Sequence, residues 1–272
     1  MANKIFTCSD LTVVYDDKKI IDKISFSLTE NSLNSVLCPN NCGKTTLIKA
    51  LSGIIYSDDG QICVNDIDLE KRYFKKYIAS ISTILEDIDN QFICNKVLEE
   101  IKYPLVNLCF KEKAINTRVE YVSSIFKIET ILGKDIDRLS NIEKVKVLLA
   151  SSVIHNPKLL LVDDIFKYLD DKESVEILKL LNVIVTKMKI TILFTTSNIL
   201  NVVDLDHIIV MSNGKKVLDD SYKNIIIKDN ELSKMGFEIP IMIDLSRKLQ
   251  FYNLIDNNII YDVDEVIDTL WK

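Results

Sequence analysis

Glycine is scarce in this chain. Only 6 of the 272 residues are Gly, about a third of the usual share, while Asn, Ile and Lys are plentiful. The scarcity extends over the whole length. A motif that normally contains glycine can therefore lack it through composition as well as through loss of function.

Cysteine and histidine are too few and too scattered to predict a zinc site. The chain has 2 His and 6 Cys, and no two cysteines form a C-x-x-C pair. The start, MANKIFTCSD, has no signal-peptide core, and no apolar run approaches the roughly 18 residues of a membrane span. These absences predict a reduced, cytosolic chain. The cysteines are Cys8, Cys38, Cys42, Cys63, Cys94 and Cys109.

Basic residues are not in excess. The chain has 34 Lys and Arg against 40 Asp and Glu, a net charge of −6. Because binding to a nucleic-acid backbone requires clustered basic residues, this balance argues against nucleic acid as a partner. Hydrophobic residues make up 47% and charged residues 27%, which is typical of a globular chain. The length suits one sizeable domain, with or without an appendage.

The first third of the chain is predicted to form mainly strands. Residues 5–15 and 23–28 alternate apolar and polar side chains, as half-buried antiparallel strands do. Residues 32–37 form a more buried strand, followed by a loop and then by the apolar spacing of a helix over 45–53. Strands are expected again up to Leu85.

A helical segment and an α/β core are predicted beyond it. Apolar residues recur at helical steps between 95 and 154. The apolar run 158–164, the helical pattern 172–188 and the buried run 190–196 then give the order strand, helix, strand. That order predicts an α/β fold with a parallel sheet and a helical insertion. A hairpin with an Asn-Gly turn is expected over 207–218.

The segment LCPNNCGKTT ends like a phosphate-binding loop but begins without its first glycine. The strict pattern G-x-x-x-x-G-K-[ST] has Gly where this chain has Cys38. Gly43, Lys44 and Thr45 keep the chemically active end, where Lys44 reaches the β- and γ-phosphates and Thr45 binds Mg²⁺. Asn41 replaces a second glycine, and Asn is the residue besides Gly that best tolerates a positive φ. The alternative is an ordinary strand-to-helix turn with a chance G-K-T.

A second motif favours the nucleotide site over coincidence. The apolar run KLLLVDD resembles a Walker B strand whose Asp163 holds Mg²⁺, although alone it is equally a buried strand with an acidic end. Both motifs follow buried strands, in the order that an ATP site requires. The N–H groups of the loop then wrap the phosphates at the start of a helix. The residues expected to contact phosphate are Asn40, Asn41, Cys42, Gly43, Lys44, Thr45 and Thr46.

In its order of motifs the sequence resembles the ATP-binding subunits of ABC transporters. The motifs are VVYDD, the phosphate loop, ILEDIDNQF, DRLSNIEKVKVLLA, LLLVDDIFKYLD, TILFTTSN and the closing hairpin, over about residues 3 to 220. The resemblance implies an α/β P-loop NTPase of the ABC ATPase type, with an N-terminal antiparallel β part. It implies an ATP-binding domain over 1–220 that contains a helical subdomain at about 88–155. The resemblance further implies a small C-terminal dimerisation appendage over 221–272.

The resemblance also implies roles for particular residues. Tyr15 stands where an aromatic side chain stacks on adenine, and Ser140 belongs to the signature loop that contacts ATP bound by a partner chain. Glu86 stands at the Q-loop glutamine, Asp164 at the glutamate that positions water, and Ser197 at the histidine that touches the γ-phosphate. The implied catalytic residues are Asp164, Glu86 and Ser197, and the implied Mg²⁺ ligands are Thr45, Asp163 and Glu86.

A narrower resemblance is to the ATPases of energy-coupling factor (ECF) vitamin and metal importers. It rests on Asp89-Asn90-Gln91-Phe92 and on the tail, MGFEIPIMIDLSRKL then DVDEVIDTLW, which contains two helical patterns. This resemblance implies a second ABC ATPase subunit, a transmembrane coupling subunit and a membrane subunit that captures the substrate. It places the chain at the cytoplasmic face of the membrane. The ATPase does not touch the transported nutrient, so its motifs do not specify that nutrient.

The positions that serve hydrolysis depart from the family pattern. Asp164 is one methylene shorter than the usual Glu, and a misplacement of about 1 Å can lower a rate roughly 100-fold. Ser197 lacks the reach and charge of His, and Glu86 adds a negative charge beside the phosphate. The positions that serve binding are kept. Because ground-state and transition-state interactions are separable, we expect MgATP binding with weakened hydrolysis.

The signature segment departs from the pattern as well. Asn141 and Ile142 replace both glycines of the family's LSGGQ, and a bulky Ile142 stands where close approach is needed. Ser140-x-x-Glu143 also has the alternative interpretation of a capping box that merely starts a helix. Because this chain is impaired in both of its contributions to a dimer, a heterodimer is favoured over a homodimer.

Two further hypotheses remain open from the sequence. One is a pseudo-ATPase that binds ATP while a partner chain hydrolyses it. The other is a soluble ABC ATPase acting on nucleic acid or ribosomes, which the acidic charge balance disfavours. For membrane docking, the acids Asp87, Asp89, Glu99 and Glu100 beside the Q-loop could receive basic residues of a coupling helix, or they could form a solvated acidic face.

Overall fold

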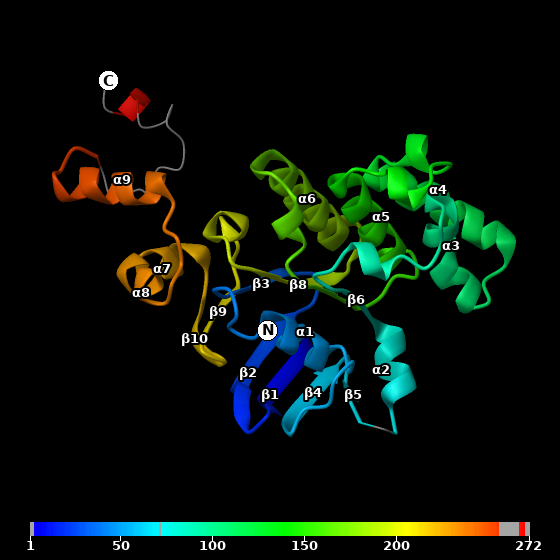
Figure 1. Cartoon of the computed structure of the whole chain (residues 1–272), viewed down its shortest axis with the longest axis horizontal. Helices are drawn as coiled ribbons and strands as arrows, with labels where there is room; N and C mark the ends of the chain where they lie inside the picture. Colours follow the sequence, from blue (N-terminus) through cyan, green and yellow to red (C-terminus); the bar gives the residue numbers. More distant parts are fainter. Residues whose placement is uncertain (1–2, 71, 256–266, 270–272) are drawn as a thin grey trace.

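Two β-sheets organise the computed structural model, which describes residues 3–70, 72–255 and 267–269. One sheet has four antiparallel strands in the order β2-β1-β4-β5. The other has six strands in the order β10-β9-β3-β8-β7-β6 and is parallel except for β10 at its edge (Figure 1). These sheets confirm the predicted α/β class with an N-terminal antiparallel part.

The antiparallel sheet comes from the alternating segments at the start of the chain. Its strands are β1 (Lys4–Tyr15), β2 (Lys18–Thr29), β4 (Asp59–Val64) and β5 (Ile67–Asp68). Strands β1 and β2 join through Asp16 and Asp17, which both have positive φ angles, as a tight two-residue hairpin requires. The inward-facing side chains, including Phe6 and Leu11, are buried.

The parallel sheet is buried on both faces. Its strands are β3 (Leu33–Leu37), β6 (Ile81–Ile84), β7 (Leu159–Val162), β8 (Thr191–Thr196), β9 (Ile208–Ser212) and β10 (Lys215–Asp220). Along β7, Leu160 and Val162 join the core beneath the helical layer, whereas Leu159 and Leu161 join the core shared with the antiparallel sheet. Successive side chains point to opposite faces, so a continuous apolar run is needed.

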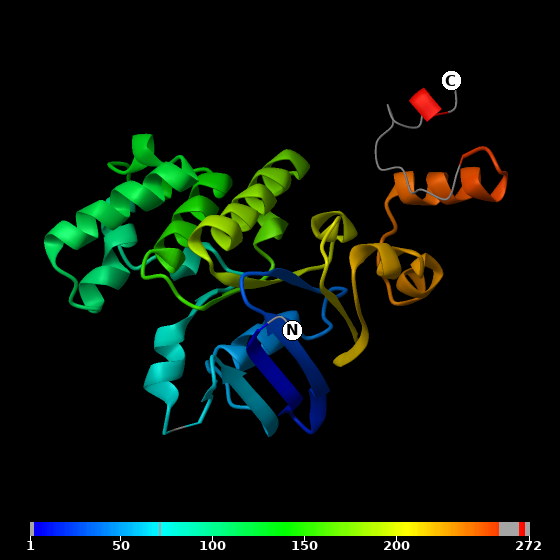
Figure 2. The ribbon, with the colours of Figure 1, turned by 180° about the vertical axis from the view of Figure 1, so that it is seen from behind.

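Helices cover the two faces of the parallel sheet. Helix α1 (Lys44–Leu51) lies on the side of the antiparallel sheet, and α6 (Asp171–Val183) lies on the other side with a π-helical turn, Ile184–Met188, after it (Figure 2). The predicted helical insertion forms α3 (Val97–Asn107), α4 (Glu112–Phe126) and α5 (Asn141–Val153). None of the helices among the described residues is long and apolar enough to cross a lipid bilayer.

One helix was not expected from the sequence. Helix α2 (Phe74–Ser80) lies in the stretch up to Leu85 that was predicted as strands. Its one buried side chain is Tyr77, whose hydroxyl donates a 2.6 Å hydrogen bond to the Leu51 carbonyl at the end of α1. With one buried side chain, the segment has no helical period in the sequence. The prediction of strands was therefore wrong for residues 74–80, whereas β4, β5 and β6 around them are strands as predicted.

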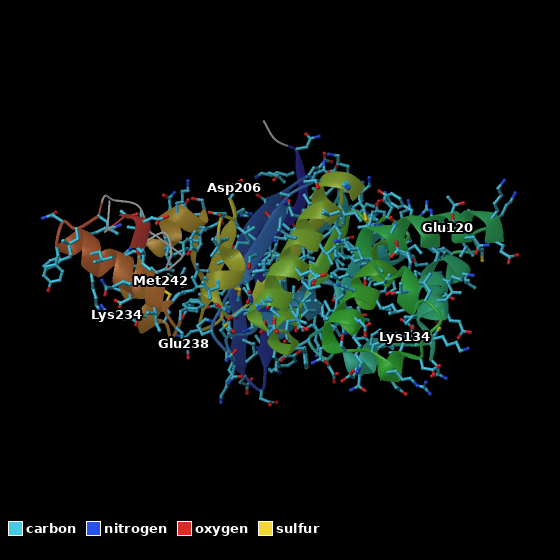
Figure 3. The ribbon with its side chains drawn as sticks, turned by 90° about the horizontal axis from the view of Figure 1, so that it is seen from above. Glu120, Lys134, Asp206, Lys234, Glu238 and Met242 are labelled. Carbon is cyan, nitrogen blue, oxygen red and sulfur yellow. A yellow bond between two sulfur atoms is a disulfide. The ribbon has the colours of Figure 1, made fainter. Side chains whose placement is uncertain are left out.

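The tail extends away from the helical insertion. It contains α7 (Tyr222–Ile226), α8 (Asp229–Lys234) and α9 (Ile241–Phe251). Figure 3 shows Lys234 and Met242 at the end of the molecule opposite Glu120 and Lys134. Arg247 ties α9 to α8 through a 2.7 Å ion pair with Asp229. Helix α9 corresponds to the first predicted helical pattern of the tail, and most of the second, over 264–272, lies outside the described residues.

Candidate nucleotide site

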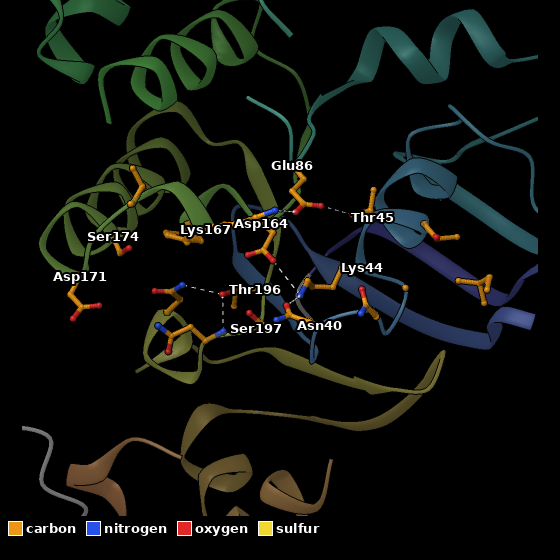
Figure 4. Close-up of a pocket in the computed structure, with 18 residues that line it drawn as sticks. Asn40, Lys44, Thr45, Glu86, Asp164, Lys167, Asp171, Ser174, Thr196 and Ser197 are labelled. Carbon is orange, nitrogen blue, oxygen red and sulfur yellow. Dashed lines mark hydrogen bonds and ion pairs between the residues drawn. The ribbon is translucent and has the colours of Figure 1, made fainter. Parts of the chain in front are cut away.

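The predicted motifs meet at the carboxyl ends of the parallel strands. The phosphate-binding loop follows β3, Asp164 follows β7, Ser197 follows β8 and Glu86 follows β6. Parallel neighbours such as Leu37 and Thr196 pair in register, so the residues beyond them share one sheet edge. A pocket of about 820 Å³ opens there (Figure 4). Of the predicted site residues, it is lined by Asn40, Asn41, Gly43, Lys44, Thr45, Thr46, Glu86, Asp164 and Ser197.

The loop reaches its turn without the missing glycines. Asn41 has φ 62° and Gly43 has φ 104°, both in the left-handed region. Asn41 therefore adopts the conformation for which the sequence analysis singled it out. At Gly43 a Cβ would lie 3.1 Å from the Ile20 carbonyl oxygen, so a side chain there would be crowded as well as strained by the positive φ. Helix α1 begins at Lys44, and the unpaired N–H groups of its first turn form a natural anion site.

Cys38 and Cys42 lie close together across the turn of the loop. Their Cα atoms are 6.3 Å apart, within the usual range for a disulfide. The tight turn brings together two cysteines that share no C-x-x-C motif, and the expectation of a reduced chain stays a prediction at this pair. Cys42 is nearly buried and is not among the residues that line the pocket, which leaves its backbone N–H as its candidate contact.

Lys44 is held inside the site by several acceptors. Its Nζ atom donates to the Cys38 carbonyl at 3.2 Å and to the Asn40 side-chain oxygen at 3.4 Å. It also lies 3.2 Å from Oδ2 of Asp164. Burial raises the pKa of Asp164, and the positive charge of Lys44 opposes that shift. The lysine is therefore oriented toward the pocket before any phosphate arrives.

Asp163 is fully buried and only half satisfied. Its Oδ1 accepts a 2.7 Å hydrogen bond from the Thr195 hydroxyl, whereas its Oδ2 has no hydrogen-bond partner among the described residues. Burial raises the pKa of Asp163, against the opposing effect of the Thr45 and Thr195 hydroxyls. A hard cation such as Mg²⁺ prefers oxygen ligands, so it would satisfy the free oxygen of this carboxylate. The pair Asp163 and Thr45 thus fits Mg²⁺.

Glu86 bridges the loop and the segment after Asp164. Its Oε2 accepts from the Thr45 hydroxyl at 3.4 Å, and its Oε1 lies 2.6 Å from Nζ of Lys167. The Lys167 ammonium lowers the pKa of Glu86, and in return Glu86 raises the pKa of Lys167. Lys167 also lines the pocket, although no motif in the sequence pointed to it.

Residues at the end of β8 were also missed. The Thr195 hydroxyl accepts a 3.0 Å hydrogen bond from the backbone N–H of Asp164 while donating to Asp163. Asn201 donates to the Thr196 hydroxyl at 3.0 Å, and both side chains line the pocket wall. The available signal was the parallel alignment of two buried strands, which places polar residues after one strand beside acids after the other.

Besides Cys42 and the buried Asp163, two further predicted site residues do not line this pocket. Tyr15 ends β1 and is 47% exposed. Ser140 is the N-cap of α5: its hydroxyl accepts from the N–H of Glu143 at 3.4 Å, and the Glu143 carboxylate accepts from the N–H of Ser140 at 2.9 Å. The capping-box interpretation is confirmed. The role of Ser140 toward a partner's nucleotide stays a prediction.

One of the four acids predicted to form a docking face for a coupling helix is buried. Glu100 is 5% exposed, and its carboxylate accepts hydrogen bonds from the backbone N–H groups of Ile93 and Cys94. The inclusion of Glu100 was therefore wrong, because it caps an internal turn instead of facing solvent. Asp89 pairs with Lys144 at 2.7 Å.

The fold and the site together define a P-loop nucleotide-binding protein: a phosphate loop after β3, with acidic residues after the parallel strand β7. A model of the ABC transporter family matches residues 21–167, more than half of the chain. The chain therefore belongs to the family of ABC transporter ATP-binding subunits.

Individual relatives agree with this assignment. The energy-coupling factor transporter ATP-binding protein EcfA of Pediococcus pentosaceus is 28% identical over 241 residues, covering 88% of this chain and 86% of the relative. A putative ABC transporter ATP-binding protein of Clostridium acetobutylicum is 27% identical, covering 89% and 88%. The structure of CbiO1 from Clostridium perfringens, part of the ABC transporter complex CbiONQ, superimposes with a TM-score of 0.78 at 25% identity, covering 92% of this chain and 99% of that one.

Proposed function

We propose that this chain binds MgATP as a subunit of an ECF-type importer and hydrolyses it slowly. The arrangement of three residues carries the proposal: Lys44 and Thr45 line one pocket, and the buried carboxylate of Asp163 interacts with the Thr45 hydroxyl. Lys44 and the N–H groups of the loop would hold the phosphates. Thr45, Asp163 and Glu86 would hold Mg²⁺, which supplies charge neutralisation at the phosphates.

Weakened hydrolysis is supported by the surroundings of Asp164. In the usual role the carboxylate at this position orients water against the γ-phosphate. Here the shorter Asp164 pairs with Lys44 at 3.2 Å, deep in the pocket. Ser197 lines the pocket but offers only a hydroxyl where the family has an imidazole. Misplacement of about 1 Å is enough to lower a rate roughly 100-fold.

The proposed assembly is supported by the relatives and by the tail. Relatives named as ECF transporter ATP-binding proteins support two ATPases, of which this chain is one, together with a transmembrane coupling subunit and a substrate-capture subunit. The chain would lie at the cytoplasmic face of the membrane and promote uptake of a small nutrient. Exposed apolar side chains on and just beyond α9 support the tail as a dimerisation appendage; they are Ile241, Phe251, Tyr252 and Leu254. We favour a heterodimer.

A non-hydrolysing partner is the second candidate. The Lys44–Asp164 ion pair favours it, because a carboxylate bound to the phosphate lysine is drawn away from water. In that case the chain would hold ATP to shape the dimer while the second ATPase hydrolyses its own. No observation favours action on nucleic acid.

The deciding experiment is phosphate release from the complex reconstituted with its membrane subunits and second ATPase. The second ATPase carries a neutralised catalytic acid at its own Walker site, and Lys44→Ala in this chain provides the blank. Turnover above that blank supports slow hydrolysis here. ATP binding without turnover supports the non-hydrolysing partner, and absence of ATP binding would remove both candidates.

A further inference from the structure

The inference concerns Glu86 and Lys167, and it rests on the proposed MgATP site. Strands β6 and β7 are parallel neighbours, with Ile84 opposite Val162. Two residues beyond Ile84 stands Glu86, and the turn after β7, Ile165–Tyr168, contains Lys167. Residues 81 positions apart are thus brought to one edge of the sheet, where Nζ of Lys167 lies 2.6 Å from Oε1 of Glu86 (Figure 4).

The negative charge of Glu86 would oppose the binding of a γ-phosphate if no cation compensated it. Its other oxygen, Oε2, accepts from the Thr45 hydroxyl, so the carboxylate reaches the residue expected to bind Mg²⁺. A carboxylate beside the γ-phosphate repels it, and the repulsion is strong where solvent is partly excluded. A neutral amide at this position would carry no such penalty. Lys167 supplies a compensating cation within the same pocket.

We propose that Lys167 is a positioning residue of the nucleotide site: it neutralises and holds Glu86, so that a Glu–Lys ion pair replaces a neutral side chain beside the γ-phosphate. The Lys167 side chain is 57% exposed and that of Glu86 36%, so the pair contributes little to the stability of the fold. Its effect is expected on ligands that carry a γ-phosphate.

Substitutions of Lys167 and of Glu86 are expected to change the nucleotide affinity in opposite directions, so binding measurements alone test the proposal. Lys167→Ala leaves Glu86 uncompensated and is expected to weaken the binding of a hydrolysis-resistant MgATP analogue about tenfold. Glu86→Gln keeps an oxygen but removes the repulsion, so it is expected to keep or tighten that binding. Glu86→Gln in the Lys167→Ala background is expected to restore affinity to within about twofold of wild type. Lys167→Arg keeps the charge and should bind like wild type.

The measurement is calorimetric titration of the purified full chain with the MgATP analogue and with MgADP. ADP lacks the γ-phosphate, so Lys167→Ala should change its affinity by less than about twofold. Lys146→Ala is the matched control, because Lys146 also pairs with a glutamate, Glu176, at 2.6 Å but does not line the pocket. It should leave both affinities unchanged.

Several results would overturn the proposal. They are equal binding of the analogue by wild type and Lys167→Ala, equal losses for ATP analogue and ADP, or no rescue in the double variant. A wild-type chain that binds no analogue at all would remove the proposed function together with this inference. A wild-type chain that binds, but is indifferent to Lys167, would remove only the inference.

Discussion

Nζ of Lys44 lies 3.2 Å from a carboxylate oxygen of Asp164, and both side chains are almost entirely buried. The residue expected to grip the phosphates is thus paired with the residue expected to position water. Phosphate and Asp164 compete for the same ammonium group. Occupancy of the site and placement of the catalytic acid are coupled through this one contact.

Neutralising Asp164 should tighten nucleotide binding. In Asp164→Asn the competing negative charge is gone, so the phosphates gain the full attraction of Lys44. We expect the affinity for MgATP to rise about 5- to 30-fold, which corresponds to roughly 1–2 kcal/mol. Equilibrium binding of a fluorescent ATP analogue would measure it. Weaker binding by Asp164→Asn would show that the ion pair does not compete with phosphate.

Lengthening the same side chain should restore hydrolysis. Asp164→Glu returns the carboxylate by about 1 Å toward the usual position, and we expect up to roughly 100-fold faster single turnover in the reconstituted complex. Binding affinity should change much less. An unchanged rate would point to Ser197 as the position that limits hydrolysis, which Ser197→His in the same background would then test.

The buried Asp163 should make the chain less stable as the pH rises. Its pKa is raised in the folded state, so its stabilising contribution is present below the ordinary value near 3.8 and is lost as the pH rises through the folded value. At pH 7, Asp163→Asn should therefore raise the melting temperature without ligand, by about 2–4 °C per kcal/mol gained. The gain should shrink as the pH approaches 4.

Stabilisation by MgATP can be measured on the wild type and on the same Asp163→Asn variant. MgATP should stabilise the wild type strongly and Asp163→Asn weakly, because the variant has lost the carboxylate expected to serve the cation. Asp137→Asn, which changes an exposed acid in another part of the chain, serves as the control. Equal melting curves for wild type and Asp163→Asn at pH 7 would contradict the assignment of a buried, unsatisfied charge.

The capping box at α5 separates two roles of Ser140. Ser140→Ala removes the hydroxyl that accepts from the Glu143 N–H, and we expect a loss of about 0.5–2 kcal/mol in the free energy of unfolding. Ser140→Asp keeps a cap but adds a negative charge toward a partner's ATP. Chemical denaturation should therefore find it near wild type, while ATP-dependent pairing with the second ATPase is lost. Pairing that survives in Ser140→Asp would leave Ser140 with capping alone.

The Cys38–Cys42 pair predicts a simple count of thiols. The Cα atoms of Cys38 and Cys42 are close enough for a disulfide, so after treatment with a mild oxidant and unfolding, four cysteines should react with an alkylating reagent, namely Cys8, Cys63, Cys94 and Cys109. After reduction all 6 should react. Intact mass spectrometry distinguishes the two products. Six alkylations before reduction would show that the two loop thiols are free.

Local features of the chain were readable in the sequence because neighbours along the chain produce them. The alternating strands, the positive φ of Asn41 and Gly43, and the Ser140–Glu143 cap each depend on interactions within a hairpin or one helical turn. The order of motifs sufficed for the ABC family. Helix α2 was missed because Tyr77 is its one buried side chain, so no helical period marks the segment, and the Tyr77 hydroxyl bonds the Leu51 carbonyl in a distant part of the chain.

The sequence by itself thus determined the strands, the turns, the caps and the kinds of residue available for phosphate and Mg²⁺. Only the tertiary structure decided which of them meet. Lys167 reaches Glu86 across 81 residues, and Thr195 reaches Asp163 across 32, because the parallel sheet sets their strand ends side by side. The physical reason is that charge pairing acts through space, and strand order alone determines which charges become neighbours.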